Sequence, residues 1–554
     1  MNSRMVKVTV RSGAAEHVLM ARPGKKLLDV LRENALPVQA VCAGTGSCGK
    51  CAVRFADGIP QITGADRKKL SQQLLEKGNR LACMVLLQKD CTIELNSLQE
   101  EEIQVPEIAA TGMLKEQPSD ARYAIGIDIG TTTLAAALIR TDQKQDAEDE
   151  ISGPEISRIR GRILAAETGI NHQRCYGADV ISRIQAAQNG AAEELQKSIT
   201  GDLTQLIDRL LQKTGITAQK IERIAMAGNT TMLHLLRGYS CAGLGTYPYR
   251  AVTLAAEEHK ASDLLPELTA EWRNCNVTIF PGISAFVGAD ILSGIYALDL
   301  MKKSAGAGFL FLDLGTNGEM AAGNGRGITV TSTAAGPVFE GGGISCGMGS
   351  ISGAICHVSM TGGRCEYRTI GDQPPVGVCG TGVMETAAAF HRSGIIDDTG
   401  LMKHPYFENG YVLAGEEGRN PVIFTQQDVR QVQLGKAAVR AGTEILLQES
   451  GLNPEQIAHV YIAGGFGYRI DFEAIRELGI LPNSLPEKTE TVGNTSLYGT
   501  LKYLVRKTQH GEEALQELMQ LCSAAHEAPL AQQDAFDEQY YAHMNFESEA
   551  AHEL

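Results

Sequence analysis

The 554-residue sequence lacks several features that would each have indicated a particular class of protein. Its first residues, MNSRMVKVTV, contain no apolar core of the kind that a secretion signal needs. No apolar run reaches the length of a membrane span, about 18 residues, because the most apolar long stretch, 280–300, is broken by Asp290 and by Gly282, Gly288 and Gly294. These absences predict a cytoplasmic protein with no membrane partner.

The sequence also lacks a basic excess. Its 50 Lys and Arg residues face 65 Asp and Glu residues, which gives a formal net charge of −15. Nucleic acids and anionic membranes are bound through basic surfaces, so neither is expected as the main partner. Hydrophobic residues at 43% and charged residues at 21% are ordinary globular values, which argues against disorder. A chain of this length is expected to fold as several domains.

Cysteine is present in number, and three of the 13 cysteines lie close together in VCAGTGSCGKC. Cys42, Cys48 and Cys51 are separated by five and then two residues. A disulfide is disfavoured in a reducing compartment, and structural zinc usually needs two separated pairs of ligands. The plant-type ferredoxin loop spaces its cysteines by four and then two residues and adds a distant fourth cysteine. The spacing here is a variant of that loop and predicts a 2Fe–2S cluster.

Cys83, in NRLACMV, is the candidate for the fourth ligand. Cys91 lies in KDCTIEL, an alternating strand pattern in which a buried cysteine is ordinary. Before the cysteine loop, VKVTVRSG and AEHVLMARPG read as a hairpin and KKLLDVLRENA reads as a helix. Glycines within the loop let the backbone wrap closely around the sulfurs. Residues 1–97 therefore resemble a 2Fe–2S ferredoxin domain of the β-grasp kind.

Residues 98–121 are acidic, contain two prolines and show little periodicity, which predicts an exposed linker. Beyond it, the sequence presents the same device twice: an apolar strand, a glycine turn with hydroxyl residues and a second apolar strand. YAIGIDIGTTTLAAALI holds the first copy, and GFLFLDLGTNGEMAAG holds the second about 185 residues later. A carboxylate at a strand end suits hydrated Mg²⁺, and a glycine turn admits phosphate oxygens. The two copies predict an internal duplication that binds the phosphates of a nucleotide.

A third glycine element, VYIAGGFG, follows another buried strand. Two phosphate hairpins followed by strand–Gly–Gly resemble the superfamily of actin, heat-shock chaperone ATPases and sugar kinases. That resemblance implies a duplicated ribonuclease-H-like fold, with 122–300 as its first half and 301–554 as its second. It also implies a site for ATP and Mg²⁺, with Asp128 and Asp313 as catalytic carboxylates. Its implied contacts are the first phosphate site at Gly130, Thr131 and Thr132, the second at Gly315, Thr316 and Asn317, and the nucleoside at Gly464, Gly465 and Phe466.

Three further residues have two interpretations each. Glu319 either binds a water in the site or faces outward along its strand. Lys436 and Arg440 lie one turn apart on the helix predicted for DVRQVQLGKAAVRAGTEILL. They form either a solvated basic stripe or a pair that flanks the nucleotide.

A ferredoxin domain joined to this kind of ATPase resembles the reductive activators of corrinoid proteins. Further stretches carry the resemblance along nearly the whole chain: YGADVISRI, AGNTTMLHLL, FPGISAFVGADI, AGPVFEGGGISCGMG, GVCGTGV, VGNTSLYG and DAFDEQYYAHMNF. The resemblance implies an ATP-dependent iron–sulfur activase that reduces the Co(II) of a corrinoid protein to Co(I), within a methyltransferase system of anaerobic metabolism. It implies a low-potential electron donor and is compatible with a homodimer.

The implied reaction is energetically uphill. Plant-type clusters have potentials near −400 mV. A deficit of roughly 150 mV for one electron corresponds to about 3.5 kcal/mol, which a difference in ATP and ADP binding between two conformations can supply. Two alternatives remain open at this stage: an ATP-driven reductase of a different low-potential metalloprotein, and a non-enzymatic nucleotide switch that senses the redox state of the cluster.

Overall fold

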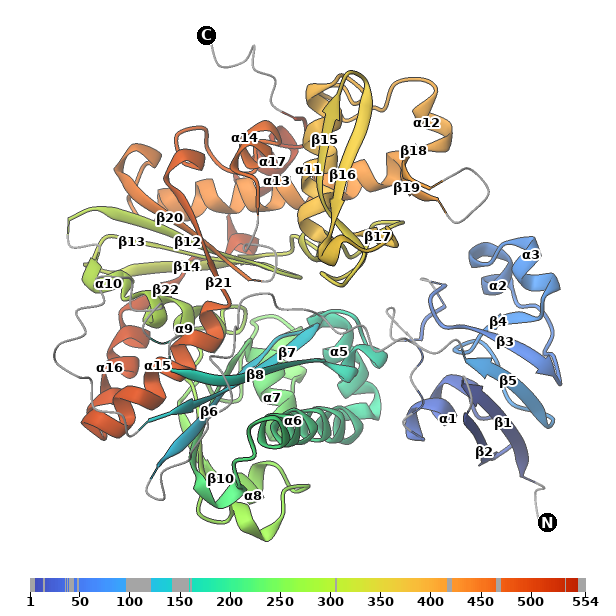
Figure 1. Ribbon diagram of the computed structural model, residues 1–554, viewed down its shortest axis with the longest axis horizontal. Helices are drawn as coiled ribbons and strands as arrows, with labels where there is room; N and C mark the ends of the chain where they lie inside the picture. Colours follow the sequence, from blue (N-terminus) through green and yellow to red (C-terminus); the bar gives the residue numbers. More distant parts are fainter. Residues whose placement is uncertain are drawn as a thin grey trace.

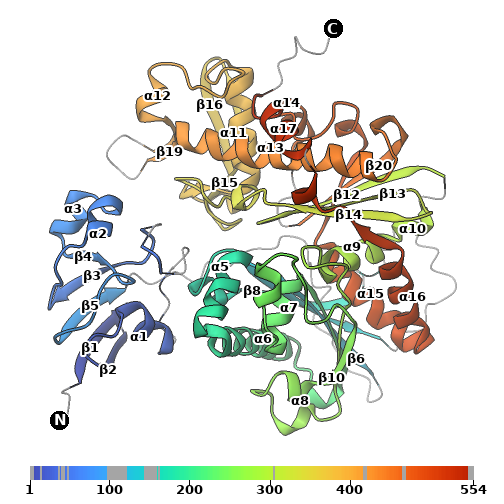
Figure 2. The ribbon, with the colours of Figure 1, turned by 180° about the vertical axis from the view of Figure 1, so that it is seen from behind.

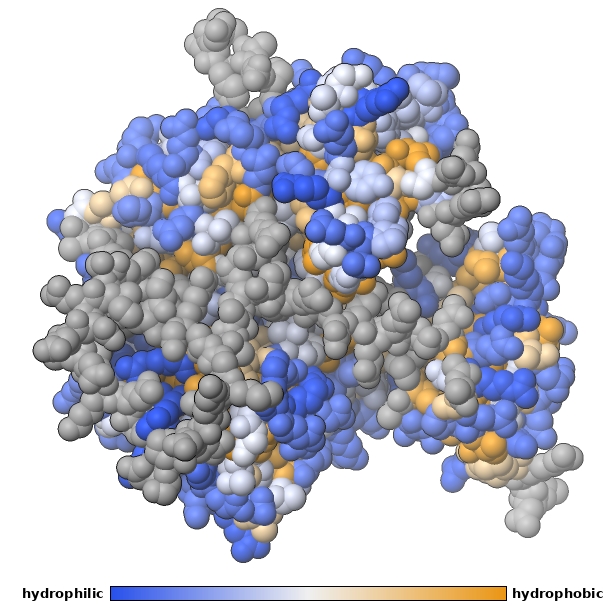
Figure 3. Space-filling model, viewed as in Figure 1, coloured by the Kyte–Doolittle hydropathy of each residue, from blue (hydrophilic) through white to orange (hydrophobic). Residues whose placement is uncertain are grey.

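The computed structural model describes residues 5–546 apart from 13–14, 35, 37, 39–43, 47–48, 96–120, 142–158, 160–161, 304–305, 416–420, 465–469 and 534. The described residues form an N-terminal domain and a larger two-part body, shown in Figure 1. None of the described helices is long and apolar enough to cross a membrane. On the face shown in Figure 3, hydrophobic residues are scattered in small groups among hydrophilic ones.

The N-terminal domain is a mixed five-stranded sheet, in the order β2-β1-β5-β3-β4, that packs against one helix. In β1, Val6, Val8 and Val10 alternate with more exposed residues, as expected for a strand with one buried face. α1 covers that face with a run of leucine and valine side chains. This arrangement is the predicted β-grasp fold. Its elements are β1 (Val6–Ser12), β2 (Ala15–Ala21), α1 (Leu27–Glu33), β3 (Ala52–Asp57), α2 (Gly64–Lys69), α3 (Gln72–Glu76), β4 (Asn79–Leu81) and β5 (Cys91–Leu95).

The first half of the larger body contains a six-stranded sheet in the order β10-β11-β9-β6-β7-β8. The long helix α6 is amphipathic, and its leucine and isoleucine face lies in the core of this half. The strands are β6 (Tyr123–Ile129), β7 (Thr133–Arg140), β8 (Ile163–Ile170), β9 (Ile221–Gly228), β10 (Glu257–Lys260) and β11 (Asn276–Ile279). The helices are the short 3₁₀ helix η1 (His172–Cys175), α5 (Val180–Ala186), α6 (Ala192–Thr214), α7 (Thr230–Arg237), α8 (Ala261–Leu264), α9 (Ala289–Leu298) and α10 (Leu300–Lys303).

The second half contains a six-stranded sheet in the order β21-β20-β12-β13-β14-β22. Its strands are β12 (Gly308–Leu314), β13 (Gly318–Gly323), β14 (Ile328–Thr333), β20 (Ile457–Ala463), β21 (Thr489–Gly493) and β22 (Ala525–Glu527). The long helix α13 runs along this sheet, as Figure 2 shows. The later helices are α13 (Gln426–Glu449), α14 (Phe472–Glu477), α15 (Thr495–His510), α16 (Glu513–Ser523) and α17 (Ala535–Ala542).

Between β14 and α13 the chain adds two small sheets. α11 packs against the first of them, next to the helical turn η6. The elements of this insertion are η6 (Pro337–Glu340), β15 (Ala354–Thr361), β16 (Arg364–Thr369), β17 (Gly377–Val378), α11 (Gly380–Arg392), α12 (Tyr406–Asn409), β18 (Tyr411–Ala414) and β19 (Val422–Phe424).

The two large sheets repeat one topology. In the first, β6, β7 and β8 form an antiparallel meander, while β9 and then β11 join β6 in parallel. In the second, β12, β13 and β14 form the same meander, and β20 and β21 add in the same way. The repeated pairings confirm the duplication that the two hairpin motifs predicted.

Two helices connect the two halves of the body. α15 and α16 follow the second sheet in sequence, but their apolar side chains lie in the core of the first half. The approach is close: a Cβ at Gly126 of β6 would lie 2.5 Å from the hydroxyl of Thr500, and a Cβ at Gly499 would lie 2.2 Å from the carbonyl of Ser293. The sequence pattern did not reveal this return, because an apolar helix face does not specify which sheet it covers.

Candidate functional site

Two of the predicted cluster ligands come together at one end of β3. Cys51 precedes β3 and Cys83 follows β4, and these strands pair with Ala52 opposite Leu81. The two sulfurs lie 3.3 Å apart, and both side chains are buried. Two sulfurs bound at about 2.3 Å to one tetrahedral metal would lie about 3.7 Å apart. Their spacing therefore fits two ligands of the same iron.

The other two predicted ligands, Cys42 and Cys48, lie outside the described residues. Within those residues no group of three or more His, Cys, Asp or Glu side chains is arranged to hold a metal. The described part of the loop has the backbone that a cluster loop needs. Gly44, Gly46 and Gly49 have φ of 84°, 79° and 80°, in the left-handed region that favours glycine. A Cβ at Gly44 would lie 3.7 Å from the Cβ of Cys83, so this loop packs directly over a predicted ligand.

Cys91 lies far from this pair. It is the first residue of β5, and a Cβ at Gly58 would lie 2.7 Å from its own Cβ. From Cys51 to Gly58 the chain follows β3 for about 20 Å at roughly 3.3 Å per residue. Burial raises the pKa of the Cys91 thiol to about 11, which opposes the thiolate form that binds metal. Cys91 is therefore a core residue, as its strand pattern indicated.

The first phosphate hairpin is the turn between β6 and β7. Asp128, near the end of β6, accepts hydrogen bonds from Asn494 (2.8 Å) and Ser496 (2.7 Å) at the start of α15. Burial raises the pKa of Asp128, while these two bonds act in the opposite direction. The hydroxyl of Thr131 accepts a bond of 3.0 Å from Asn229, the residue that caps α7.

The second hairpin, between β12 and β13, has the same form. Gly315 donates from its backbone to the carbonyl of Asn317 (3.0 Å), which closes the turn after Asp313. Asn317 donates in turn to Glu319 (3.1 Å). Glu319 is only 8% exposed, so the interpretation that it faces outward is wrong.

The third glycine element joins the second hairpin. Gly464 has φ of 91°, and a Cβ there would lie 2.7 Å from a carboxylate oxygen of Asp313. This position admits only glycine, because any side chain would displace the carboxylate. Gly465 and Phe466, predicted to lie beside the nucleoside, fall outside the described residues.

Five carboxylates gather around the two hairpins: Asp128, Asp290, Asp313, Glu319 and Glu340. Burial raises the pKa of Asp313 to about 8, and its negative neighbours Asp290, Asp128 and Glu340 add to the effect. Burial likewise raises the pKa of Asp290 to about 7. Mg²⁺ is usually held by one or two protein carboxylates together with water and phosphate oxygens. A divalent cation would relieve the repulsion among these groups, so the residues present suit Mg²⁺.

The two hairpins meet at Glu340, in η6. The hydroxyls of Thr132 and Thr316 lie 3.4 Å apart. Both donate to the same carboxylate oxygen of Glu340, Thr316 at 2.9 Å and Thr132 at 3.4 Å. Glu340 thus bridges the two halves of the body at the position where the phosphate motifs face each other.

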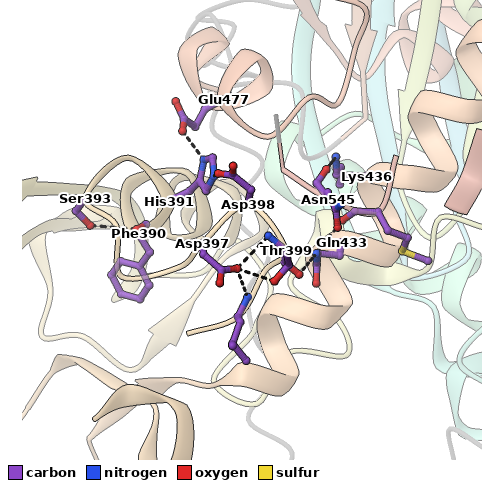
Figure 4. A network of polar contacts seen from close by, with 12 residues as sticks. Phe390, His391, Ser393, Asp397, Asp398, Thr399, Gln433, Lys436, Glu477 and Asn545 are labelled. Atoms are coloured by element: carbon purple, nitrogen blue, oxygen red, sulfur yellow. Dashed lines mark hydrogen bonds and ion pairs between the residues drawn. The ribbon is translucent and has the colours of Figure 1, made fainter. Parts of the chain in front are cut away.

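Lys436 and Arg440 have other contacts. Both are buried, so the interpretation as a solvated stripe is wrong. Figure 4 shows Lys436 directed toward Asn545, to whose carbonyl its ammonium donates, and Phe546 lies beside it with its ring centre 5.7 Å from the nitrogen. Arg440 donates to the carbonyl of Leu481 (2.8 Å). The contacts of Lys436 hold the C-terminal segment, and neither residue's contacts support the alternative that the pair flanks the nucleotide.

The same C-terminal segment covers a second polar cluster, also drawn in Figure 4. His391 contacts Glu477 (2.5 Å) through one ring nitrogen and Asp398 (3.1 Å) through the other. The hydrogen bond with Glu477, and then that with Asp398, raises the pKa of His391 against the effect of burial. These residues line a cavity of about 740 Å³. The backbone of Phe546 donates to the carbonyl of Asp398 (2.8 Å), so the cluster anchors the end of the described chain.

Sequence reasoning missed four residues of the site: Asp290, Glu340, Asn494 and Ser496. Their segments, GADI, PVFEG and VGNTSLYG, were noticed only as parts of a resemblance. Asp290, Asn494 and Ser496 lie at helix starts and Glu340 at the end of a helical turn, and polar residues at helix ends are a weak signal because they usually cap helices.

The comparisons with known proteins cover nearly the whole chain. Residues 11–88 match the 2Fe-2S iron-sulfur cluster binding domain, 156–303 match the RACo middle region, and 308–553 match the C-terminal domain of RACo, the ASKHA domain. The corrinoid activation enzyme RamQ of Eubacterium limosum is 29% identical, with 87% of this chain and 90% of RamQ covered.

Two further similarities agree. A [Co(II) methylated amine-specific corrinoid protein] reductase of Methanosarcina barkeri is 27% identical, with 70% of this chain and 71% of that protein covered. A solved structure of a reductive activator for corrinoid, iron–sulfur protein superposes with a TM-score of 0.67 at 26% identity, and 98% of each chain is covered.

Proposed function

Because the chain belongs to the family of reductive activators of corrinoid proteins, in which a ferredoxin domain is joined to an ASKHA domain, we propose that it uses ATP to drive the reduction of a corrinoid protein from Co(II) to Co(I). One observation supports this most strongly: a pair of buried cluster thiols and two facing phosphate hairpins occur on one chain. The cluster, when bound by Cys42, Cys48, Cys51 and Cys83, would supply the electron. We place the reaction in the cytoplasm, where the thiols stay reduced.

The nucleotide site of this proposal lies between the two hairpins. Thr131, Thr132 and Gly130 would contact phosphate on one side, and Gly315, Thr316 and Asn317 on the other. Asp128 and Asp313 would position Mg²⁺ or the attacking water. Asp128 is suited to a fixed role, because both of its oxygens accept hydrogen bonds from the start of α15. The adenosine would approach the Gly464 turn, which touches Asp313.

The cluster and the nucleotide site would serve different steps of the proposed reaction. Hydrolysis of ATP has no need of the cluster thiols, and reduction of the cluster by a chemical donor has no need of ATP. Only the transfer to cobalt is energetically uphill, so only that step requires both. The corrinoid protein of a methyltransferase system would be the partner, and a low-potential electron carrier would be the donor.

The test is a visible-spectrum assay with a corrinoid protein from the same organism, an electron donor and Mg-ATP. Cys48→Ser should still hydrolyse ATP yet form no Co(I). Asp313→Ala should still accept electrons from a strong reductant, and it too should form no Co(I). If Co(I) appears at the same rate and extent without ATP, or without the cluster, the proposal is wrong. If the natural acceptor is not a corrinoid protein, the wild-type protein should still hydrolyse ATP and still accept electrons from a strong reductant, but the cobalt should stay as Co(II).

A further inference from the structure

The turn of the first phosphate hairpin is held by two buried residues, Asn171 and Arg183. The side chain of Asn171 donates to the carbonyl of Gly130 (2.9 Å), and its backbone donates to the carbonyl of Thr132 (3.0 Å). Arg183 donates to the carbonyl between them, that of Thr131, at 2.5 Å. Both side chains are 0% exposed. Three consecutive carbonyls of the turn are thus bonded to Asn171 and Arg183, and the turn cannot shift without moving these residues or breaking the bonds.

Asn171 caps the short helix η1 by accepting a bond from the backbone of Gln173 (3.1 Å), while Arg183 belongs to α5. The side chain of Gln173 accepts from Arg183 (3.4 Å) and donates to the carbonyl of Leu195 in α6 (2.8 Å). A 3₁₀ helix of four residues is only about 8 Å long, at roughly 2 Å per residue. η1 is therefore a short, internally bonded connection between the phosphate hairpin and Cys175, at its far end.

Cys175 is where the N-terminal domain contacts the body. Arg32, in the last turn of α1, donates from two of its nitrogens to the carbonyl of Cys175 (3.0 and 2.5 Å), and its guanidinium lies 4.9 Å from the ring centre of Tyr176. The backbone of Val38 hydrogen-bonds to the thiol of Cys175. Figures 1 and 2 both show the N-terminal domain beside α5 and α6.

Arg32 also lies close to the predicted cluster. Burial lowers its pKa, and Cys51 is one of the neighbouring groups that act in the opposite direction. Arg32 is therefore bonded to the end of η1 and is also influenced by the charge of a predicted cluster ligand. Hydrogen bonds and the four residues of η1 form a continuous path from Thr132 to Arg32.

Phosphate binding would disturb this path at its origin. The hydroxyls of Thr132 and Thr316 already donate to Glu340. A phosphate oxygen that takes these hydroxyls competes with a carboxylate of like charge, so Thr132 has to leave Glu340. The first hairpin then loses its bond to the second half and keeps its bonds to Asn171 and Arg183.

We propose that η1 links the two sites, so that phosphate binding at the first hairpin weakens the docking of the N-terminal domain at Cys175 and Tyr176. This inference rests on the nucleotide site proposed above. A displacement of η1 shifts Cys175 relative to Arg32, and a hydrogen bond weakens steeply as its distance and angle depart from their optimum. The N-terminal domain would then be released to its partner only when nucleotide is bound.

Coupling between sites is reciprocal, so the loss of docking should tighten nucleotide binding. In the full-length, anaerobically purified protein, Arg32→Ala should bind a non-hydrolysable ATP analogue about 5-fold more tightly by titration calorimetry, the lower end of typical couplings. Tyr176→Leu, which removes the other side of the contact, should shift the affinity in the same direction. Arg11→Ala is the matched control, because Arg11 lies on the surface of the same domain and pairs with Glu16. It should leave the affinity unchanged.

Hydrogen exchange gives a second measurement that does not depend on the cluster or on activity. In the wild-type protein the analogue should raise exchange in residues 27–33 and 172–176 together. If Arg32→Ala fails to retain its cluster, Tyr176→Leu carries the comparison. An unchanged affinity in both variants, with no change of exchange in the wild type, overturns the inference alone. Failure of the wild-type protein to bind the analogue overturns the nucleotide site as well.

Discussion

In the N-terminal domain, the position of a cysteine along β3 is expected to decide whether it is a cluster ligand or a core residue. Cys51 and Cys83 lie at one end of β3 with their sulfurs 3.3 Å apart, while Cys91 lies near Gly58 at the other end. We therefore expect the three buried thiols of this small domain to have two different roles. Their burial is alike, so only their position along the strand distinguishes them.

Cys83→Ser should therefore lose most of the iron and acid-labile sulfide of the anaerobically purified protein. Cys91→Ser should keep about two of each per chain, the content of one 2Fe–2S cluster. Chemical analysis and the visible spectrum measure both. The opposite pattern, with Cys91 essential and Cys83 dispensable, would show that the ligand assignment is wrong.

The buried carboxylates of the candidate nucleotide site should make the stability of the folded protein depend on pH, and the direction of this dependence follows from their pKa shifts. Burial raises the pKa of Asp313 from its ordinary 3.8 to about 8, so the folded protein holds a proton that the unfolded chain has released between these values. Stability should therefore fall as pH rises from about 4 to 8, because the folded state binds more protons. In thermal unfolding at pH 8.5 without Mg²⁺ or nucleotide, Asp313→Asn should melt several degrees above the wild type. At pH 5 the difference should shrink, and an equal gain at both pH values would contradict this origin.

Among the elements, α9 and α15 depend on small residues where they cross. Ser293 of α9 donates its hydroxyl to the carbonyl of Ser496 (2.6 Å), and a Cβ at Gly499 would lie 2.2 Å from the carbonyl of Ser293. α15 also supplies the two hydrogen bonds to Asp128. The crossing of α9 and α15 therefore helps to position Asp128, a candidate catalytic residue, in addition to packing the core.

Gly499→Ala should destabilise the protein by about 1–3 kcal/mol, the usual effect of overpacking. Gly201→Ala is a matched control within α6, where nothing lies within 4 Å of the added Cβ. That change should be neutral or stabilise by about 0.5–1 kcal/mol through helix propensity. Chemical denaturation measures both. Equal effects of the two substitutions would contradict the close approach of α15 to α9.

Local patterns predicted those parts of the fold and the site whose determinants are neighbours in sequence. Strand alternation, the cysteine spacing and the two Asp-containing hairpins all belong to this class. Asn494 reaches Asp128 across more than 300 residues, and Glu340 meets Thr132 only because two half-folds face each other. The burial of Lys436 depends on Asn545, in a segment with no periodic signal. Such contacts follow from tertiary packing, which local patterns do not encode.

At the scale of the whole molecule, the N-terminal domain differs from the two halves of the body. Its core consists of its own residues alone. The core of the first half includes side chains of α15 and α16, which lie close to the other end of the chain. The domain boundary near residue 97 thus separates two cores, while the one near residue 300 does not.

A chain of residues 1–95 should therefore fold by itself and bind a cluster, with a cooperative thermal transition. A chain of residues 121–303 should not, since it leaves uncovered the apolar surface that α15 and α16 bury. Circular dichroism and gel filtration measure both. Supplying residues 304–554 as a second chain should restore folding of the first half. A stable, monomeric 121–303 chain would contradict this account.

The return of α15 to the first sheet has a consequence for biosynthesis. The strands around Asp128 leave the ribosome several hundred residues before the helix that completes their core. At the usual rates of elongation this delay is on the order of tens of seconds. For that time the nascent chain displays an apolar sheet face, to which chaperones bind readily. The larger body should thus need assistance while it is being made, whereas the N-terminal domain, emerging first, can fold at once.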